Sequence, residues 1–227
     1  MYTIALLILL AIGFPLQDGY RQARDDMVRI QIAGRGVSHP AVLRAMNTVP
    51  RHLFVRSAWI DDAYDDSPLP IGRGQTISQP YIVAYMTELL NPHQRDKILE
   101  VGTGSGYQAA ILSTLIDSVF SVEIIKELCI EASARLKRLG YHNVATMNAD
   151  GFYGWNEHAP YDAIIVTAAA EYIPPPLIEQ LKDGGKMVIP VGSPFLVQTL
   201  MLVEKRGKEV TTRSLMPVRF VPLSGDH

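Results

Sequence analysis

The sequence predicts an α/β fold whose core is a doubly wound, mostly parallel sheet. Three observations indicate this fold. A short apolar strand at 97–101 runs into a glycine-rich turn and then a helix, and strand-like and helix-like segments alternate regularly after it. Near the C-terminus, two further strand-like segments flank the charged turn 205–208, which predicts antiparallel edge strands. Alternating strands and helices give parallel strands that helices cover on both faces.

An apolar run from Ile4 to Phe14 lies near the start of the chain. It is long enough for the core of a signal peptide and too short to span a bilayer. It has no Lys or Arg before it and no clear small-x-small cleavage site after it. For residues 1–16 three interpretations stay open: a signal or weak membrane anchor, a helix packed on the domain, or an upstream start outside the fold. Residues 17–227 are expected to form a single domain.

Helical spacing predicts a lead-in of helices over 17–90, ahead of the sheet. Apolar residues recur at helical intervals in Gln17–Gly36 and again in His39–Val49. Ser38 is the expected cap of the second helix, and Pro40 suits its first turn. This lead-in is expected to fold against the domain rather than to form a separate unit.

The stretch just before the sheet combines an acidic segment with a glycine-rich loop. The acidic segment, Asp61–Asp66, is expected to be a solvated loop. The glycine-rich loop at 69–79 leads to an apolar helix that begins at Pro80. Thr76 and Ser78 place two hydroxyls at the N-terminus of this helix, where free N–H groups and the helix dipole favour an anion. Ser78 therefore has two interpretations, a helix cap or a group that binds an anionic ligand.

The sheet itself is expected within 97–227. The expected strands are 97–101, 118–123, 143–147, 161–166 and 185–191, the expected helices are 106–116, 125–139 and 174–182, and the hairpin strands are Val197–Glu204 and Glu209–Pro217. A tail follows at Val218–Leu223. In such sheets ligands lie beyond the carboxyl ends of the strands, where four polar residues fall in this chain: Glu100, Glu123, Asp150 and Thr167.

The glycine-rich turn predicts a nucleotide-binding elbow. Gly102, Gly104 and Gly106 allow a tight turn from strand to helix and leave the first N–H groups of the helix accessible. Their pattern differs from the G-x-G-x-x-G of dinucleotide sites. Glu100 would repel a pyrophosphate but suits an ammonium or sulfonium, and Glu123 stands near the offset at which an acid meets ribose hydroxyls. The two acids favour S-adenosylmethionine as the ligand over a plain strand–helix connection.

Composition argues against several classes of protein. The net charge is −2 with acids and bases interspersed, so nothing favours nucleic acid as a partner. The histidines show no metal-ligand spacing, and no metal is expected. The single cysteine, Cys129, lies in a helical pattern and excludes an internal disulfide.

Six blocks of the sequence match the pattern of one known family. The blocks are Val49–Val55, Gln75–Pro80, Leu99–Ala110, Tyr161–Ala170, Leu177–Gly192 and Val218–Leu223. From about residue 22 onward the chain resembles the protein-L-isoaspartate O-methyltransferases, a branch of the Rossmann-like class I methyltransferases. The glycine block is common to methyltransferases, whereas the Thr76–Pro80 loop and the Arg219–Leu223 tail are specific to this branch. The chain departs from the family pattern in its apolar N-terminus and at Glu171-Tyr172.

The resemblance implies transfer of a methyl group from S-adenosylmethionine to the free carboxylate of an L-isoaspartyl residue in a damaged protein or peptide. The ester then closes to a succinimide that reopens partly to normal aspartyl, so the reaction is a repair. Ser78 matches the active-site serine of the family. The residues that fall on the cofactor site are Glu100, Gly102, Thr103, Gly104, Ser105, Gly106, Glu123, Asp150, Gly151 and Thr167. Those that fall on the substrate site are Thr76, Ile77, Arg219, Phe220 and Val221.

These residues suffice for the chemistry that the resemblance implies. A carboxylate is already ionised at neutral pH, so its methylation needs no general base. Catalysis is then expected to come mostly from positioning, with the Ser78 hydroxyl aiming one carboxylate oxygen at the methyl group. Glu100 would bear on the methionine ammonium directly or through water, Glu123 on the ribose diol, and Asp150 on the adenine amino group.

Two alternative functions stay open. One is a class I methyltransferase with a different acceptor, and the other is a catalytically idle Rossmann-like domain used as a binding or anchoring module. For the first interpretation we expect isoaspartyl proteins and peptides as partners, S-adenosyl-L-homocysteine as the product, and a monomer. The family default is the cytoplasm, and export to the periplasm or weak membrane contact through residues 4–14 is the alternative.

Overall fold

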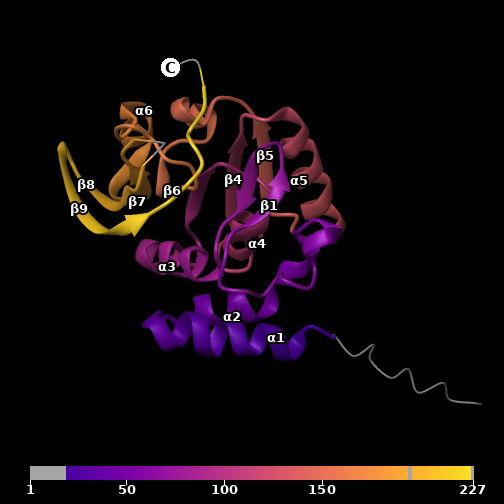
Figure 1. Ribbon diagram of the computed structural model, residues 1–227. Coiled ribbons are helices and arrows are strands. Elements are labelled where there is room, and N and C mark those ends of the chain that lie inside the picture. The colour runs from indigo at the N-terminus through magenta and orange to yellow at the C-terminus, as the bar shows by residue number, and fades with distance from the viewer. Residues whose placement is uncertain (1–18, 194–195, 226–227) are drawn as a thin grey trace, which may run out of the picture.

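The computed structural model describes residues 19–193 and 196–225 (Figure 1). It contains a seven-stranded sheet, in the order β5-β4-β3-β6-β7-β8-β9, and a separate two-stranded sheet of β1 and β2. The expected signal or anchor at residues 1–16 lies outside the described residues. Within those residues, no helix has the length and apolar character needed to cross a membrane.

The large sheet is mostly parallel, as predicted. Its strands are β3 (Lys97–Val101), β4 (Ser118–Glu123), β5 (Val144–Asn148), β6 (Tyr161–Val166), β7 (Leu181–Val191), β8 (Gln198–Arg206) and β9 (Glu209–Val218). β3 to β7 run parallel, and β8 and β9 add the predicted antiparallel edge. The chain moves outward from β3 to β5 and then returns to place β6 on the other side of β3. This reversal between β3 and β6 is the point at which doubly wound sheets open a ligand crevice.

Helices lie on both faces of the sheet. They are α1 (Arg21–Asp26), α2 (Pro40–Thr48), α3 (Pro80–Leu90), α4 (Tyr107–Ser113), α5 (Lys126–Arg138) and α6 (Pro175–Glu179), and α1 continues as the π-helical turn Met27–Ile32 and the 3₁₀ turn Ala33–Arg35. In Figure 1 the lead-in helices α1 and α2 form a layer next to α3, away from the β8–β9 edge.

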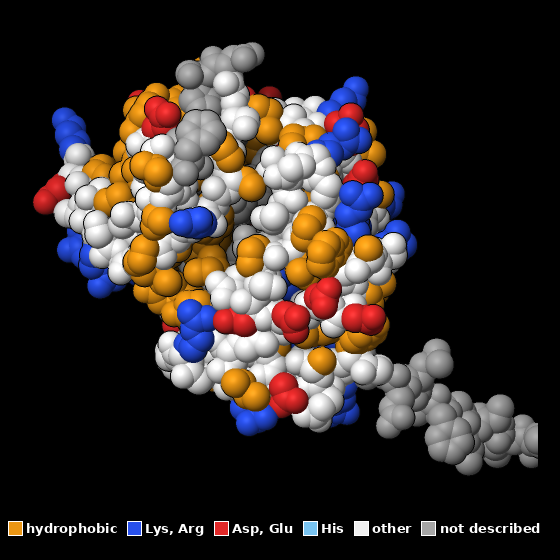
Figure 2. All heavy atoms as spheres, viewed as in Figure 1, with side chains coloured by type: hydrophobic (Ala, Val, Ile, Leu, Met, Phe, Trp, Pro, Cys, Tyr) orange, Lys and Arg blue, Asp and Glu red, His pale blue; other side chains and the backbone are white. Residues whose placement is uncertain are grey.

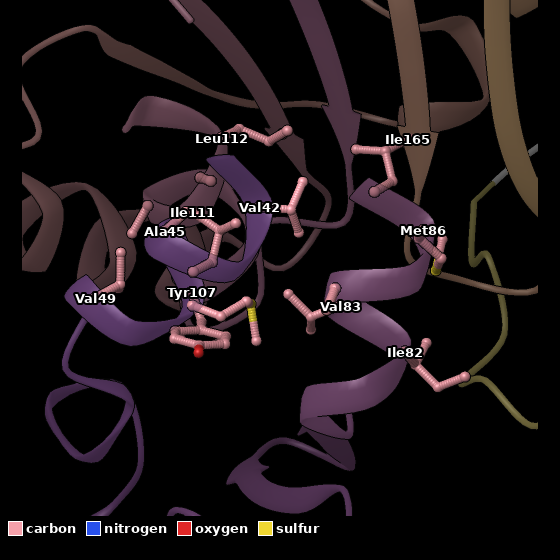
Figure 3. Close-up of a cluster of buried hydrophobic side chains, with 14 of the residues drawn as sticks. Val42, Ala45, Val49, Ile82, Val83, Met86, Tyr107, Ile111, Leu112 and Ile165 are labelled. Carbon is pink, nitrogen blue, oxygen red and sulfur yellow. The ribbon is translucent and has the colours of Figure 1, made fainter. Parts of the chain in front are cut away.

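Two clusters of buried apolar side chains fill the two faces. The larger one joins the lead-in to the sheet and contains Val42 and Ala45 of α2, Val83 and Met86 of α3 and Ile111 of α4; in Figure 3 Val42 lies between Ile111 and Val83. All five side chains are fully or almost fully buried. The smaller cluster lies on the opposite face, under α6. The lead-in therefore shares the core of the sheet, in the way that its apolar spacing predicts.

The expected cap of α2 is wrong by one residue. His39, and not Ser38, is the N-cap, and its Nδ1 accepts a hydrogen bond of 3.4 Å from the Val42 amide. The backbone N–H groups of Ser38 and His39 both donate to one carboxylate oxygen of Glu88 on α3, at 2.7 and 2.6 Å. The His39 side chain thus caps the helix, and the Glu88 carboxylate fixes the segment that leads into it.

Two lead-in segments also differ from the prediction. The acidic segment is only partly solvated, because Ala63 and Tyr64 in its middle are buried. The glycine-rich loop at 69–79 contains a short hairpin, β1 (Leu69–Gly72) and β2 (Gln75–Ile77). Pro70 and the short length of both strands hide this hairpin from a periodicity argument.

The last parallel strand begins earlier than predicted. β7 starts at Leu181 rather than 185, and α6 accordingly ends at Glu179. The pairing of β7 with β6 has an irregularity between Tyr161 and Ala163, where the chain passes through Gly184 and Gly185. The two glycines are typical of a turn, which is why the sequence predicts a strand only beyond them.

Candidate active site

The glycine-rich turn connects β3 to α4 with three residues of left-handed backbone. Gly102, Gly104 and Gly106 have φ values of 98°, 52° and 85°. At Gly102 glycine is also required by space, because a Cβ there would collide with the Thr167 hydroxyl. That hydroxyl donates to the Gly102 carbonyl at 2.7 Å and so fixes the turn to the end of β6. The predicted elbow is therefore present.

Glu100 and Glu123 lie on the same side of the sheet. Glu100 pairs with Ser121 in the register of β3 and β4, and Glu123 follows Ser121 by two residues. Glu100 is fully buried, and one of its carboxylate oxygens accepts a hydrogen bond from the Ser121 hydroxyl. The Ser121 oxygen also bonds the Thr103 hydroxyl at 2.6 Å, which links Glu100 to the glycine-rich turn.

The environment of Glu100 favours a protonated carboxyl. Burial raises its pKa to about 8, the hydrogen bond from Ser121 opposes this rise, and the negative charge of Glu123 adds to it. No hydrogen bond of ordinary geometry from the described residues reaches its other oxygen, Oε1. Glu100 is thus a buried acid with one spare acceptor atom directly beneath the turn.

Glu123 is held in place by the backbone. Its Oε2 accepts from the Gly104 amide at 2.7 Å, and its Oε1 accepts from the Ile125 amide at 2.9 Å. The side chain lines a cavity over the turn, which we call the glycine-turn cavity. Gly102, Gly104, Gly151, Thr167 and the tail residues 221–224 also line this cavity.

A second cavity, of about 360 Å³, adjoins the first. We call it the Ser78 cavity; it is lined by Ser78, Gln79, Ile82, Val197, Arg219 and Phe220, among others. Thr76, Thr167 and Val221 line both cavities. Figure 2 shows hydrophobic side chains gathered beside a hollow near the centre of this face of the molecule.

Ser78 does not cap α3, so that interpretation of the residue is wrong. The N-cap of α3 is Gln79, and no side chain bonds the free N–H groups there. The 76–78 segment instead lies against the glycine-rich turn, because both line a narrow gap that also reaches Thr167. The Ile77 side chain points into the core, and Thr76 is exposed. Ser78 therefore lines the Ser78 cavity and this narrow gap rather than capping its own helix.

The C-terminal tail forms the wall between the cavities. The Ala169 amide donates to the Val221 carbonyl and the Leu223 amide donates to the Ala169 carbonyl, both at 2.8 Å. On the other side, the Phe220 amide donates to the side chain of Gln198 at 2.9 Å. Arg219 is exposed, at the edge of the Ser78 cavity.

The remaining cofactor-site candidates divide into lining and supporting residues. Gly151 lines the glycine-turn cavity and packs so closely on Val101 that a Cβ would collide with it. Asp150 does not line the cavity; its carboxylate accepts from the Phe152 amide at 2.9 Å and caps the 3₁₀ turn Gly151–Tyr153. Gly106 is the N-cap of α4 and packs against α5.

Thr103 and Ser105 are buried inside the glycine-rich turn. The Thr103 hydroxyl bonds Ser121, and Ser105 Oγ accepts from the Tyr107 amide at 3.3 Å. Both residues also line the narrow gap beneath Ser78. They shape the turn from within rather than forming the wall of the glycine-turn cavity or the Ser78 cavity.

Several lining residues were not predicted. On the glycine-turn cavity they include Gln75, Ile124, Ile125, Ala168, Pro222 and Leu223, and on the Ser78 cavity they include Ile82, Val197 and Met216. Ile124 and Ile125 could have been predicted from the sequence, because they directly follow Glu123 at the end of a predicted strand. Nothing in the local sequence distinguishes Val197 or Met216 from ordinary strand residues. Within the described ranges, no three His, Cys, Asp or Glu side chains gather into a metal-binding group.

The sequence matches a model of a known protein family. Residues 22–227 match the model described as protein-L-isoaspartate(D-aspartate) O-methyltransferase. A protein-L-isoaspartate O-methyltransferase 2 of Syntrophobacter fumaroxidans is 53% identical over 239 aligned positions, which cover all of this chain and 97% of the relative. A protein-L-isoaspartate O-methyltransferase 1 of Nitrosospira multiformis is 57% identical, with 92% of this chain and 89% of the relative covered.

Solved structures share the fold. A protein-L-isoaspartate O-methyltransferase superposes with a TM-score of 0.82 at 30% identity, covering 89% of this chain and 66% of the other. A second structure, described as a putative protein-L-isoaspartate O-methyltransferase of Plasmodium falciparum in complex with S-adenosyl-L-homocysteine, superposes with a TM-score of 0.76 at 24% identity. That superposition covers 88% of this chain and 98% of the other.

Proposed function

The chain belongs to the protein-L-isoaspartate O-methyltransferase family, and from that premise we propose its function. It transfers the methyl group of S-adenosylmethionine to the free carboxylate of L-isoaspartyl residues in damaged proteins and peptides. The observation that carries this proposal is the position of the Ser78 segment, which lies against the glycine-rich turn between two adjoining cavities. One cavity suits the methyl donor and the other suits the acceptor peptide.

The residues around the glycine-turn cavity fit the donor. Gly102 leaves no room for a Cβ, so backbone lies close to the cavity. Glu123 is preset by two backbone amides and offers acceptor capacity for the ribose hydroxyls. S-adenosylmethionine, when bound, supplies an electrophilic methyl on a positively charged sulfur. An acid with an unpaired oxygen close to the turn suits such a cation.

We propose that Glu100 acts on the bound methyl donor electrostatically and does not contact it directly. Its carboxyl is buried beneath the turn and does not line the glycine-turn cavity. It reaches the turn through Ser121 and Thr103. A positive charge in the cavity would favour its ionised form. Asp150 acts one step further away, because it caps the 3₁₀ turn that presents Gly151 to the cavity.

On the acceptor side, Ser78 aims the substrate carboxylate. Its hydroxyl has no hydrogen-bond partner among the described residues, so it can donate to a carboxylate oxygen of the peptide. The backbone of the 76–78 segment and of the tail at 219–221 would complete the acceptor site. Since the acceptor is already ionised, no general base is needed and positioning carries the catalysis.

Paired peptides that differ only in isoaspartyl against aspartyl test the function. With radiolabelled donor we expect label in the isoaspartyl peptide alone. Equal labelling of both peptides would assign the chain to a methyltransferase with another acceptor. No labelling, together with no calorimetric signal for S-adenosylmethionine, would leave the idle binding module as the reading.

Ser78→Ala tests the role of the hydroxyl. Removal of one aiming donor should lower kcat/KM for the isoaspartyl peptide about 10²-fold or more, while the Kd for S-adenosyl-L-homocysteine changes by less than about twofold. Ser214→Ala, an exposed serine on β9, is the matched control and should behave as wild type. A Ser78→Ala variant with full activity would remove Ser78 from the mechanism.

We further propose that the protein is a cytoplasmic monomer, which follows the family default. The apolar run Ile4–Phe14 supports the alternative of export or of weak membrane contact. Mass-spectrometric reading of the mature N-terminus distinguishes these cases, because cleavage after the run indicates export. Light scattering should give the mass of one chain, 25.1 kDa for the uncleaved protein.

A further inference from the structure

Gln198 makes a side-chain junction beside the Ser78 cavity. It is the first residue of β8 and is 1% exposed. Its Nε2 donates to the carbonyls of Ser193 and Leu196 at 3.0 and 2.8 Å, and its Oε1 accepts from the Phe220 amide at 2.9 Å. The side-chain amide therefore donates two hydrogen bonds to the segment before β8 and accepts one from the C-terminal tail.

The junction stands where the sheet ladder ends. Gln198, the first residue of β8, pairs with Val218, the last residue of β9, and the tail then leaves β9 to pair with Ala169. The amide of Phe220 lies in between, where no strand partner follows. A buried or half-buried amide needs an acceptor, and the Gln198 side chain supplies it.

The tail is thus anchored in two different ways. Toward the glycine-turn cavity its anchors are backbone bonds with Ala169, which no substitution of a side chain removes directly. Toward the Ser78 cavity its anchor is the Gln198 carboxamide. Val197, next to Gln198, and the tail residues Arg219 to Val221 line that cavity together.

We propose that Gln198 is a positioning residue for the acceptor: it holds the tail and Val197 in the arrangement that receives the isoaspartyl peptide, and it contacts neither substrate. This inference rests on the proposed function, because it assigns the Ser78 cavity to the peptide. Loss of the junction should weaken peptide binding and leave the donor side, with its backbone anchors, in place.

The chain contains a matched control in Gln180. This glutamine is 4% exposed, its Oε1 accepts from the Trp155 amide at 2.9 Å, and its Nε2 donates to the Tyr153 carbonyl at 2.8 Å. It performs the same kind of backbone junction but lines neither cavity. A general loss of stability from removing a buried amide should therefore appear equally in both variants.

The experiment compares Gln198→Met with Gln180→Met. For Gln198→Met we expect the KM of the isoaspartyl peptide to rise about tenfold or more, with kcat and the Kd for S-adenosyl-L-homocysteine within about threefold of wild type. For Gln180→Met we expect a lowered Tm and a peptide KM within about twofold of wild type. A folded Gln198→Met with wild-type peptide KM overturns the proposal, and so does an equal rise of KM in both variants.

Gln198→Glu keeps the side-chain volume; because the buried position faces two carbonyls, the neutral carboxyl is favoured, which accepts from the Phe220 amide and donates one of the two hydrogen bonds. We expect a peptide KM between those of wild type and Gln198→Met, about threefold above wild type, and this variant carries the test should Gln198→Met not fold. A wild-type KM in Gln198→Glu then overturns the proposal. If the wild-type enzyme labels no isoaspartyl peptide, the proposed function is wrong. If the wild type labels the peptide but the Gln198 variants keep the wild-type peptide KM, only the proposed role of Gln198 is wrong.

Discussion

The carboxyl of Glu100 is a titrating group buried under the glycine-rich turn, and its burial gives the unliganded protein a defined pH dependence. Its pKa is about 8 in the folded chain against an ordinary value of 4.5. Between these pH values the folded chain keeps a proton that the unfolded chain has lost. The free energy of unfolding should therefore fall as the pH rises through this range.

Glu100→Gln removes this titration and keeps an acceptor for Ser121. Denaturant unfolding of wild type and variant should be compared from roughly pH 5.5 to 8.5. Over this pH range the wild type should lose more than about 1.4 kcal/mol of unfolding free energy relative to the variant. This loss is the equivalent of a shift of one pKa unit. Parallel stability curves would mean that Glu100 titrates near its ordinary value in the folded protein.

Gly102 combines a left-handed backbone with a collision. Gly102→Ala adds the strain of φ 98° and forces the Cβ against the Thr167 hydroxyl. We expect a loss of stability of about 1–3 kcal/mol and a weakening of S-adenosyl-L-homocysteine binding of about tenfold or more by calorimetry. Gly140→Ala is the control, because its φ is 87° and a Cβ there meets nothing. It should lose stability through strain alone and bind the product normally.

At this scale the sequence predicted the residue types of the site better than their contacts. Gly102, Gly104 and Glu123 line the glycine-turn cavity, whereas Gly106 packs against α5. The position of Glu100 beneath the turn was not predictable, because it depends on Ser121, which is indistinguishable from any other strand residue in the sequence. The same holds for Gln198, whose partners lie before it and 22 residues after it in the chain.

Among the elements, the tail after β9 contributes most to the site. A chain that ends at Val218 lacks the wall of both cavities but keeps every strand of the sheet. We expect it to fold, to lose methylation of the isoaspartyl peptide by more than about 10²-fold, and to bind S-adenosyl-L-homocysteine weakly. A chain that ends at Ser224 keeps the wall and should retain activity. Normal product binding by the shorter chain would show that the tail is dispensable for the donor.

Helices and strands with a strong hydrophobic pattern could be predicted from the sequence. Short strands that are defined only by their hydrogen-bonded pairing with another strand could not. β3, β4 and β6 have the predicted bounds because buried parallel strands are mostly apolar segments bounded by turns. The β1–β2 hairpin has only a few residues in each strand, and its pairing is what defines it. For the same reason the sequence placed Ser78 near a helix start but gave no indication that a hairpin presents it to the turn.

The whole molecule shares one large core that runs from the lead-in to the sheet. Met46 of α2 is fully buried in the same cluster as Ile98 of β3 and Val188 of β7. Met46→Ala should therefore lower the unfolding free energy of the entire chain by about 2–5 kcal/mol. We expect far-UV and near-UV circular dichroism to report one coincident transition in wild type and variant. Two separate transitions would mean that the lead-in is a unit of its own.

Val221 lies in the wall of both cavities, and this has a consequence for how the two ligands bind together. A segment that touches both ligands couples their binding free energies, and thermodynamic linkage makes the coupling reciprocal. The factor by which bound peptide alters the affinity for S-adenosyl-L-homocysteine must equal the factor by which the nucleoside alters the affinity for peptide. Titration calorimetry can therefore measure this one coupling free energy from either partner, and the two values must agree.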